Sequence, residues 1–209
     1  IGSVIILFIT LYLVHGFNSK STVAIIGTVL SLLITGVLAV IFTNFTRLTG
    51  FADEESIYLL NIGTHALNIK GILLAGMIIG ALGVLDDITV SQASIAEQIY
   101  KANPELSSWE IYKRAMKVGV DHVSSIVNTL VLAYAGASLS LMILFTINTA
   151  GALTLGQAVN NEAIATEIVR TVVGSIGLVL AVPITTIIAA NFFKKKIIKP
   201  VIDTHSHMH

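Results

Sequence analysis

The stretch Gly71-Ile-Leu-Leu-Ala-Gly-Met-Ile-Ile-Gly-Ala-Leu-Gly-Val-Leu-Asp-Asp-Ile-Thr-Val-Ser-Gln-Ala-Ser94 decides which kind of protein this is. It contains no Lys or Arg and is long enough to cross a bilayer as a helix, which takes about 20 residues. A helix is the open-chain structure that satisfies its own backbone hydrogen bonds in lipid. We therefore expect a membrane-spanning helix that carries two adjacent acids, Asp86 and Asp87.

The composition around this stretch points the same way. The 209 residues are 55% hydrophobic and only 11% charged, with a mean hydropathy of +0.88, whereas soluble domains carry roughly 25% charged residues. We predict an all-α integral membrane protein with one transmembrane domain over residues 1–199 and a tail over 200–209, whose histidines we interpret as a cloning or processing remnant. The expected spans are 1–17, 22–43, 71–94, 123–147 and 169–193.

The connections between these spans differ in character. Asn18–Ser21 is short, so the first two helices should form a hairpin. Residues 95–122 form a polar, amphipathic helical segment that Asn103-Pro104 interrupts, and Ser107 or Ser108 can cap the helix that follows. Most of the 12 basic residues lie in this segment, the first turn and the tail. The positive-inside rule therefore places the C-terminus in the cytoplasm and the N-terminus of this chain outside. Because Ile1 already lies in an apolar run, we expect this chain to be part of a longer protein.

The glycines of the central stretch share a face with the second acid. Gly76, Gly80, Gly83 and Asp87 follow each other at steps of four, three and four residues, and small residues let another helix approach closely. We therefore expect these glycines to pack against another helix and Asp87 to point into that interface. Asp86 lies about 100° around the helix and roughly 22 Å along it, past the midplane toward the cytoplasm.

A charged Asp inside a bilayer costs about 2.5–3.5 kcal/mol or more, and two neighbouring carboxylates repel, so one should hold a proton near neutral pH. We interpret Asp86 and Asp87 as a proton or cation relay. The alternative is that both lie in interfacial water or only fasten helices together. Candidate supporting residues are Thr89, Ser91, Asn128 and Thr129, for which ordinary hydrogen bonding between helices is the alternative.

Several classes of function find no support in the sequence. The formal net charge is zero and there is no cysteine, so we expect neither a nucleic-acid partner nor thiol chemistry. Metal-ligand clusters, phosphate-binding loops and Ser/His/Asp arrangements are absent from the sequence, so we expect no metal and no cofactor. An intramembrane aspartyl protease would need two acids on different helices. Asp121, at the start of the fourth span, is the other candidate acid and fits a helix cap better, so we do not expect an enzyme.

Two strings carry a resemblance to a known family. Gly80–Ser94 and Thr-Val-Val-Gly-Ser-Ile-Gly-Leu-Val-Leu-Ala-Val-Pro-Ile-Thr-Thr186 resemble the YibE/F-like family of bacterial multi-helix membrane proteins, over nearly the whole chain. More distantly, the helix order is similar to helices two to six of one half of an RND-superfamily transporter, a superfamily that includes the SecD/SecF motor. That similarity implies a proton relay at Asp86 and Asp87, although Gly83 precedes Asp86 by one residue fewer than the RND pattern.

The RND similarity also implies a basic partner for the relay, supplied there by the other half of the transporter. No Lys or Arg lies mid-membrane in this chain, so a second subunit, the same or a different chain, or neutral groups such as Asn128 must take its place. We expect a proton-motive-force-coupled transporter or translocation component of the bacterial cytoplasmic membrane with an unidentified substrate. The alternative is a membrane scaffold or assembly factor that docks a partner at Trp109–Lys117.

Overall fold

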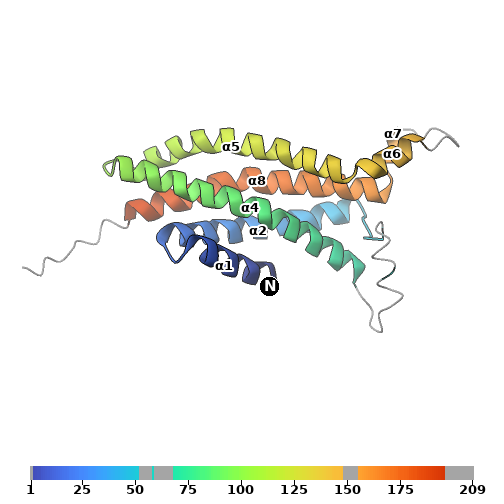
Figure 1. The fold of residues 1–209 in the computed structure, drawn as a ribbon, viewed down its shortest axis with the longest axis horizontal. Coiled ribbons are helices and arrows are strands. Elements are labelled where there is room, and N and C mark those ends of the chain that lie inside the picture. The colour runs from blue at the N-terminus through green and yellow to red at the C-terminus, as the bar shows by residue number, and fades with distance from the viewer. Residues whose placement is uncertain (1, 52–57, 59–67, 148–154, 196–209) are drawn as a thin grey trace, which may run out of the picture.

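The computed structural model describes residues 2–51, 58, 68–147 and 155–195. The regular structure in this described part is entirely α-helical, as expected (Figure 1). The helices are α1 (Gly2–His15), α2 (Ser19–Phe45), α4 (Ile69–Ala102), α5 (Ser108–Ala137), α6 (Leu139–Ile147), α7 (Leu155–Val159) and α8 (Glu162–Lys195).

Four of these helices, α2, α4, α5 and α8, are long and apolar enough to cross a membrane. The remaining predicted span corresponds to α1, which has 14 residues and is therefore shorter than a full crossing. The protein is thus a multi-pass membrane protein by the length and composition of its helices, with four candidate spans and the shorter apolar helix α1 among the described residues.

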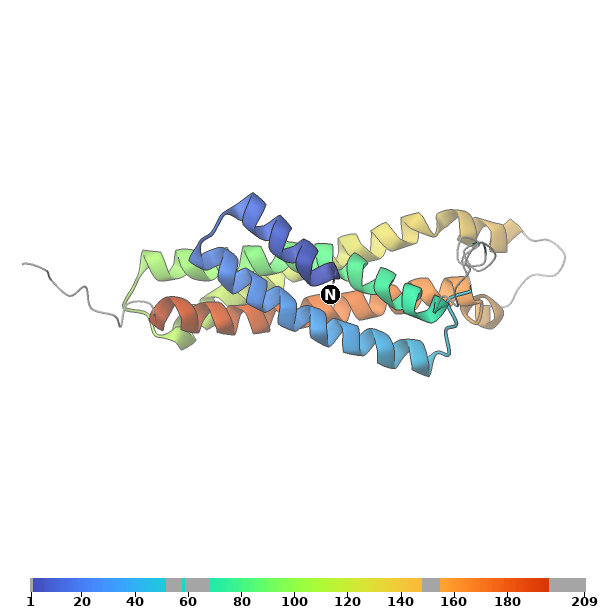
Figure 2. The same cartoon turned by 90° about the horizontal axis from the view of Figure 1, so that it is seen from below.

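Three helices, α2, α4 and α8, pack against one another in pairs and form the centre of the bundle (Figures 1 and 2). Helix α5 lies against α8 and α4, and α1 covers the bundle beside α2. The middle of the core is apolar, with Leu85 and Ile88 of α4 against Leu178 of α8. The bundle therefore buries one side of α4 and leaves the opposite side exposed.

Glycines of α2 and α8 set how closely these two helices approach. A Cβ added at Gly27 would lie 3.1 Å from the Cβ of Thr185, and one added at Gly177 would lie 3.2 Å from the Cβ of Thr35. Such contacts require glycine because a methyl group would collide with the facing threonine. The two contacts also show that α2 and α8 run antiparallel, since the residue number rises along one helix as it falls along the other.

The amphipathic segment predicted between the third and fourth spans is not a separate element. Helix α4 continues to Ala102 and ends with Asn103 as its C-cap, directly before Pro104. Helix α5 then begins at Ser108, because Ser107 forms a capping box with Glu110. The predicted break is therefore confirmed, and of the two serines expected to cap the next helix Ser107 does so. The amphipathic stretch belongs to the C-terminal end of α4 and the N-terminal end of α5.

The fourth predicted span, 123–147, is not one continuous helix. Helix α5 ends at Ala137, and Ser138 forms its C-cap through its backbone N–H, which donates to Tyr134. The chain continues as the separate helix α6. Gly136, a poor helix former, lies at this break, within a run that is too uniformly apolar for the sequence to have marked a boundary.

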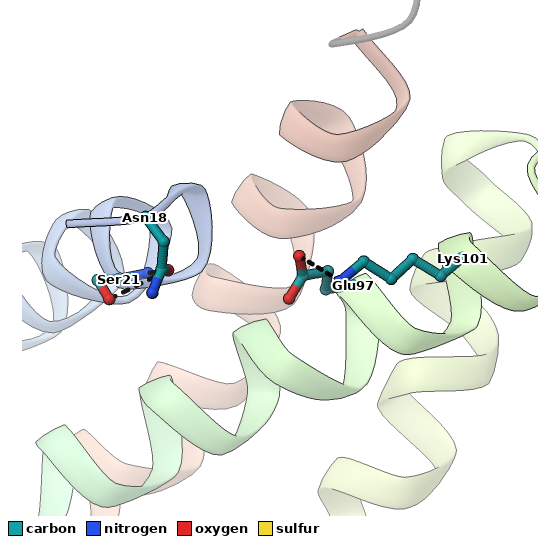
Figure 3. A network of polar contacts seen from close by, with 4 residues as sticks. All are labelled: Asn18, Ser21, Glu97 and Lys101. Carbon is teal, nitrogen blue, oxygen red and sulfur yellow. Dashed lines mark hydrogen bonds and ion pairs between the residues drawn. The ribbon is translucent and has the colours of Figure 1, made fainter. Parts of the chain in front are cut away.

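Local polar contacts hold the helices at the end of the bundle where α2 begins and α4 and α8 end. Asn18 caps α2 by accepting from the Ser21 backbone N–H at 2.8 Å, and Glu97 pairs with Lys101 at 3.0 Å one turn along α4 (Figure 3). The Lys194 ammonium donates to the Pro104 carbonyl at 3.0 Å, which joins α8 to the α4–α5 turn. At 34 residues, α4 and α8 are about 51 Å long and so extend well beyond the ~30 Å hydrocarbon core.

These contacts predict an asymmetry among glycine substitutions. Gly27→Ala and Gly177→Ala should each lower the free energy of unfolding by about 1–3 kcal/mol, the usual effect of overpacking. The control is Gly76→Ala, because a Cβ there meets no atom within 4 Å; this variant should keep or slightly raise stability. Thermal unfolding in mild detergent measures all three variants. Equal losses for all three would contradict the close packing of α2 on α8.

Candidate functional site

The Asp86–Asp87 pair lies at the middle depth of the bundle. The hydroxyls of Thr28 and Thr89 are 2.5 Å apart and set the register between α2 and α4. Asp86 precedes Thr89 by as many residues as Ser31 follows Thr28, so Asp86 is level with Ser31 in these antiparallel helices. The midpoint of α2, which spans Ser19–Phe45, adjoins Ser31. The pair therefore lies inside the hydrocarbon core when α2 is centred in the bilayer.

The two acids of the pair have different surroundings. Asp86 is half-buried and its Oδ1 atom is fully buried, whereas Asp87 is exposed. The expectation that Asp87 points into a packed helix interface is therefore wrong within this chain. The reason is that α2 and α8 contact the side of α4 that carries Ile88 and Gln92, and Asp87 lies on the opposite side of the helix.

The glycine face of α4 shares the exposed position of Asp87. Gly76, Gly80 and Gly83 are exposed; a Cβ at Gly76 or Gly83 would meet nothing within 4 Å, and one at Gly80 would lie 3.4 Å from the Tyr134 hydroxyl. The expected close approach of another helix is thus not found at Gly76 or Gly83 in the described part of the chain. A role of these glycines in packing against a second chain stays a prediction.

Polar side chains from three helices form a buried polar seam, which consists of Thr28, Thr89, Gln92 and Thr186. Thr89 donates to the Asp86 carbonyl at 3.1 Å and contacts the Thr28 hydroxyl. One turn further along α4, the Gln92 amide nitrogen donates to Thr186 Oγ1 at 2.7 Å and to the Ala115 carbonyl of α5 at 2.9 Å. The polar seam therefore joins α2, α4, α5 and α8, and it lies between Asp86 and the C-terminal end of α4.

Some buried polar atoms in the polar seam and next to it can still form a hydrogen bond. The Oε1 atom of Gln92 is buried and has no hydrogen-bond partner among the described residues, and the same holds for Ser31 Oγ and Thr185 Oγ1. Buried polar atoms usually have a hydrogen-bond partner, so these three atoms call for an explanation. All three lie on the helices that surround Asp86.

Helix α5 reaches the polar seam through a glycine. A Cβ at Gly119 would lie 2.8 Å from both amide atoms of Gln92 and 2.7 Å from Cγ1 of Val182. Because Gly119 has no side chain, the Gln92 side chain fits between α5 and α8. Gln92 and Thr186 stood in the motif strings, but their shared position emerges only when three helices pack together.

The other predicted supporting residues have different outcomes. Thr89 lies in the polar seam, and Ser91 is half-buried one turn beyond Asp87. Asn128 and Thr129 are exposed on α5, and the Thr129 hydroxyl donates to the Ser125 carbonyl of its own helix at 3.1 Å. The structure therefore brings Thr89 beside Asp86 and leaves Asn128 and Thr129 on the outer surface of the bundle.

Charged residues are sparse around the Asp pair in the described part of the chain. Arg170 pairs with Glu167 at 3.2 Å, in the first turns of α8 and far from the level of Asp86. Among the described residues no group of three His, Cys, Asp or Glu side chains could hold a metal ion. The ionisable groups at this level of α4 are thus the carboxyls of Asp86 and Asp87, with the polar seam beginning one turn further along the helix.

Comparison with known protein families gives a match over most of the chain. The family model described as YibE/F-like protein matches residues 1–195. No curated protein and no solved structure matches the chain. The match covers every described helix.

The polar seam predicts a measurable coupling between α2 and α4. In a double-mutant cycle of Thr28→Val and Thr89→Val, the two hydroxyls should show a coupling energy of about 0.6 kcal/mol, with about 1.7 kcal/mol as the upper bound for membrane proteins. Thr129→Val is the control, because its hydroxyl bonds only within α5, and it should show no coupling to Thr28→Val. Unfolding in detergent provides the measurement; additive effects of the two seam variants would refute the contact.

Proposed function

The chain belongs to the YibE/F-like family, and we propose that it is a transporter or translocation component that uses the proton-motive force through Asp86. The carrying observation is the position of this carboxyl group: half-buried, at the middle depth of the bundle, beside a buried polar seam. Ionisable residues inside membrane segments are rare and costly, and they commonly mark ion or proton pathways.

The positions of the buried polar groups along the bundle support access of a proton to Asp86 from the cytoplasmic side. Thr89 and Gln92 follow Asp86 toward the cytoplasmic end, and the Gln92 amide extends to Thr186. On the external side of Asp86, Met77 and Leu73 of α4 lie in an apolar cluster with Val173 of α8. Thr35 and Thr43 of α2 are also buried on this side. The polar seam supports proton exchange between Asp86 and the cytoplasm in this proposal.

The two adjacent acids would then have separate roles. Asp86 faces the interior and is suited to binding and releasing a proton, whereas Asp87 faces the outside of the bundle.

A second candidate function is a scaffold that docks a cytoplasmic partner. Trp109 is 61% exposed, its ring stacks on Tyr112 with centroids 5.1 Å apart, and the Lys113 ammonium lies 5.4 Å from the Trp109 centroid. Exposed aromatic rings with an adjacent cation are typical of protein-binding surfaces. This surface lies on the part of α5 that extends from the membrane.

Proton flux in liposomes tests the relay. Under an imposed membrane potential, Asp86→Asn should reduce flux to the level of protein-free liposomes, because the amide cannot exchange a proton. The double variant Asp86→Asn/Asp87→Asn should show the same loss and no more. Glu97→Gln is the matched control on the same helix, since Glu97 pairs with Lys101 at the cytoplasmic end, and it should keep the wild-type flux.

Two outcomes would redirect the proposal. Wild-type flux in Asp86→Asn would exclude this acid as the relay. Activity in cells that survives Asp86→Asn but is lost in Trp109→Ala would favour the scaffold, because that variant alters only the exposed aromatic surface.

A further inference from the structure

Helix α5 exposes polar side chains where a membrane helix facing lipid should be apolar. Its exposed side carries Asp121, Ser124, Ser125 and Asn128, and Asp87 is exposed on the neighbouring helix α4. We call these five residues the polar face. Their exposure reflects the packing of α5, which turns Val123 and Leu130 toward the core and leaves the opposite side uncovered by the rest of the chain.

The polar face lies at bilayer depth. The contact of Gly119 with Gln92 sets the level of α5 against α4, and the two helices run antiparallel. Ser124 lies as many residues beyond Gly119 as Asp87 lies before Gln92, so the two are level, and Asn128 is level with Gly83 in the same way. Because Asp87 adjoins the midpoint of the bundle, these side chains lie inside the hydrocarbon core.

The other exposed faces of the bundle provide an internal comparison. At similar depths α2 exposes Leu33 and Val37, and α8 exposes Val179 and Leu180. Those faces suit lipid chains, whereas the polar face would place a carboxyl, an amide and hydroxyls against lipid. Polar groups at this depth are expected to face protein or a water-filled cavity, so the polar face needs a protein cover.

We propose that a second copy of this chain covers the polar face, related by a two-fold axis along the bilayer normal. Such an axis keeps every residue at its own depth, so Asp87 of each copy meets the level of Ser124 of the other, and Gly83 meets the level of Asn128. The face carries both kinds of group that this requires: carboxyls that accept, and the Asn128 amide and Ser125 hydroxyl that donate. The Ser124 hydroxyl donates to the Val120 carbonyl of its own helix at 2.7 Å and can accept from a partner. An isologous interface needs this self-complementarity.

The glycines of α4 fit the same arrangement. Gly80 and Gly83 border Asp87 on the exposed side of α4, and a second copy could approach the backbone closely there, as helices do at small residues. The inference concerns assembly and does not depend on proton transport, so flux and association fail or succeed separately.

Disulfide crosslinking tests the proposal, because the sequence contains no cysteine and every engineered thiol is unique in each copy. Gly83→Cys and Ser125→Cys are introduced singly into the full chain in native membranes. Each variant should form a dimer of twice the chain mass on mild oxidation. The control is Val37→Cys, on the lipid-facing side of α2 and 60% exposed, and it should remain monomeric.

A second measurement does not depend on crosslinking geometry. Photobleaching of single labelled particles in native-membrane nanodiscs should show two copies for the wild type, and Asp87→Leu/Asn128→Leu should raise the monomer fraction at least tenfold. This variant replaces exposed side chains, so circular dichroism should show the helical content of the wild type, while loss of the dimer should lower the unfolding temperature. Crosslinking at Gly83→Cys and Ser125→Cys no stronger than at Val37→Cys, single-copy wild-type particles, or crosslinks only to a different protein would each overturn the proposal.

Discussion

The close approach of α2 and α8 is the contact on which the rest of the bundle depends. Gly27 and Gly177 lie against threonines of the facing helix, and the short spacing leaves α4 room to contact both helices at once. Helix α4 can then place Thr89 against α2 and Gln92 against α8. Without that spacing, the polar seam would have no enclosed site, and its amide and hydroxyl groups would be exposed to lipid, where unmet hydrogen bonds are costly.

Helical geometry gives adjacent residues separate environments. Neighbours in sequence differ by about 100° around a helix, so one acid of the pair lies toward the packed interior and the next lies on the outer surface. A chain can thus combine an interior function and an assembly function in one dipeptide. The same geometry explains why α5 presents valine and leucine to the core and serine and asparagine to the outside.

The sequence predicted the class of fold, the hairpin at Asn18, the break at Pro104 and the Ser107 cap, because each of these depends on local residue types. The orientation of the glycine face of α4 could not be predicted, because it depends on which side α2 and α8 contact. The polar seam was missed for a similar reason: Thr28, Gln92 and Thr186 are far apart in sequence and each is unremarkable alone. Periodicity identified a face of small residues, but not whether that face meets protein of the same chain.

The length of α4 has a mechanical consequence. The helix runs without a break from the level of Asp86 to Ala102, about 24 Å further along its axis, and the bond between Lys194 and Pro104 joins its end to α8. A continuous helix of this kind moves as a rigid rod, and its contact with α5, where Gln92 meets Gly119, lies between Asp86 and the end of the helix. A tilt of α4 that accompanies a change at Asp86 would therefore displace the α4–α5 turn outside the membrane. In the same way, a force applied to that turn would tilt α4 at the level of Asp86.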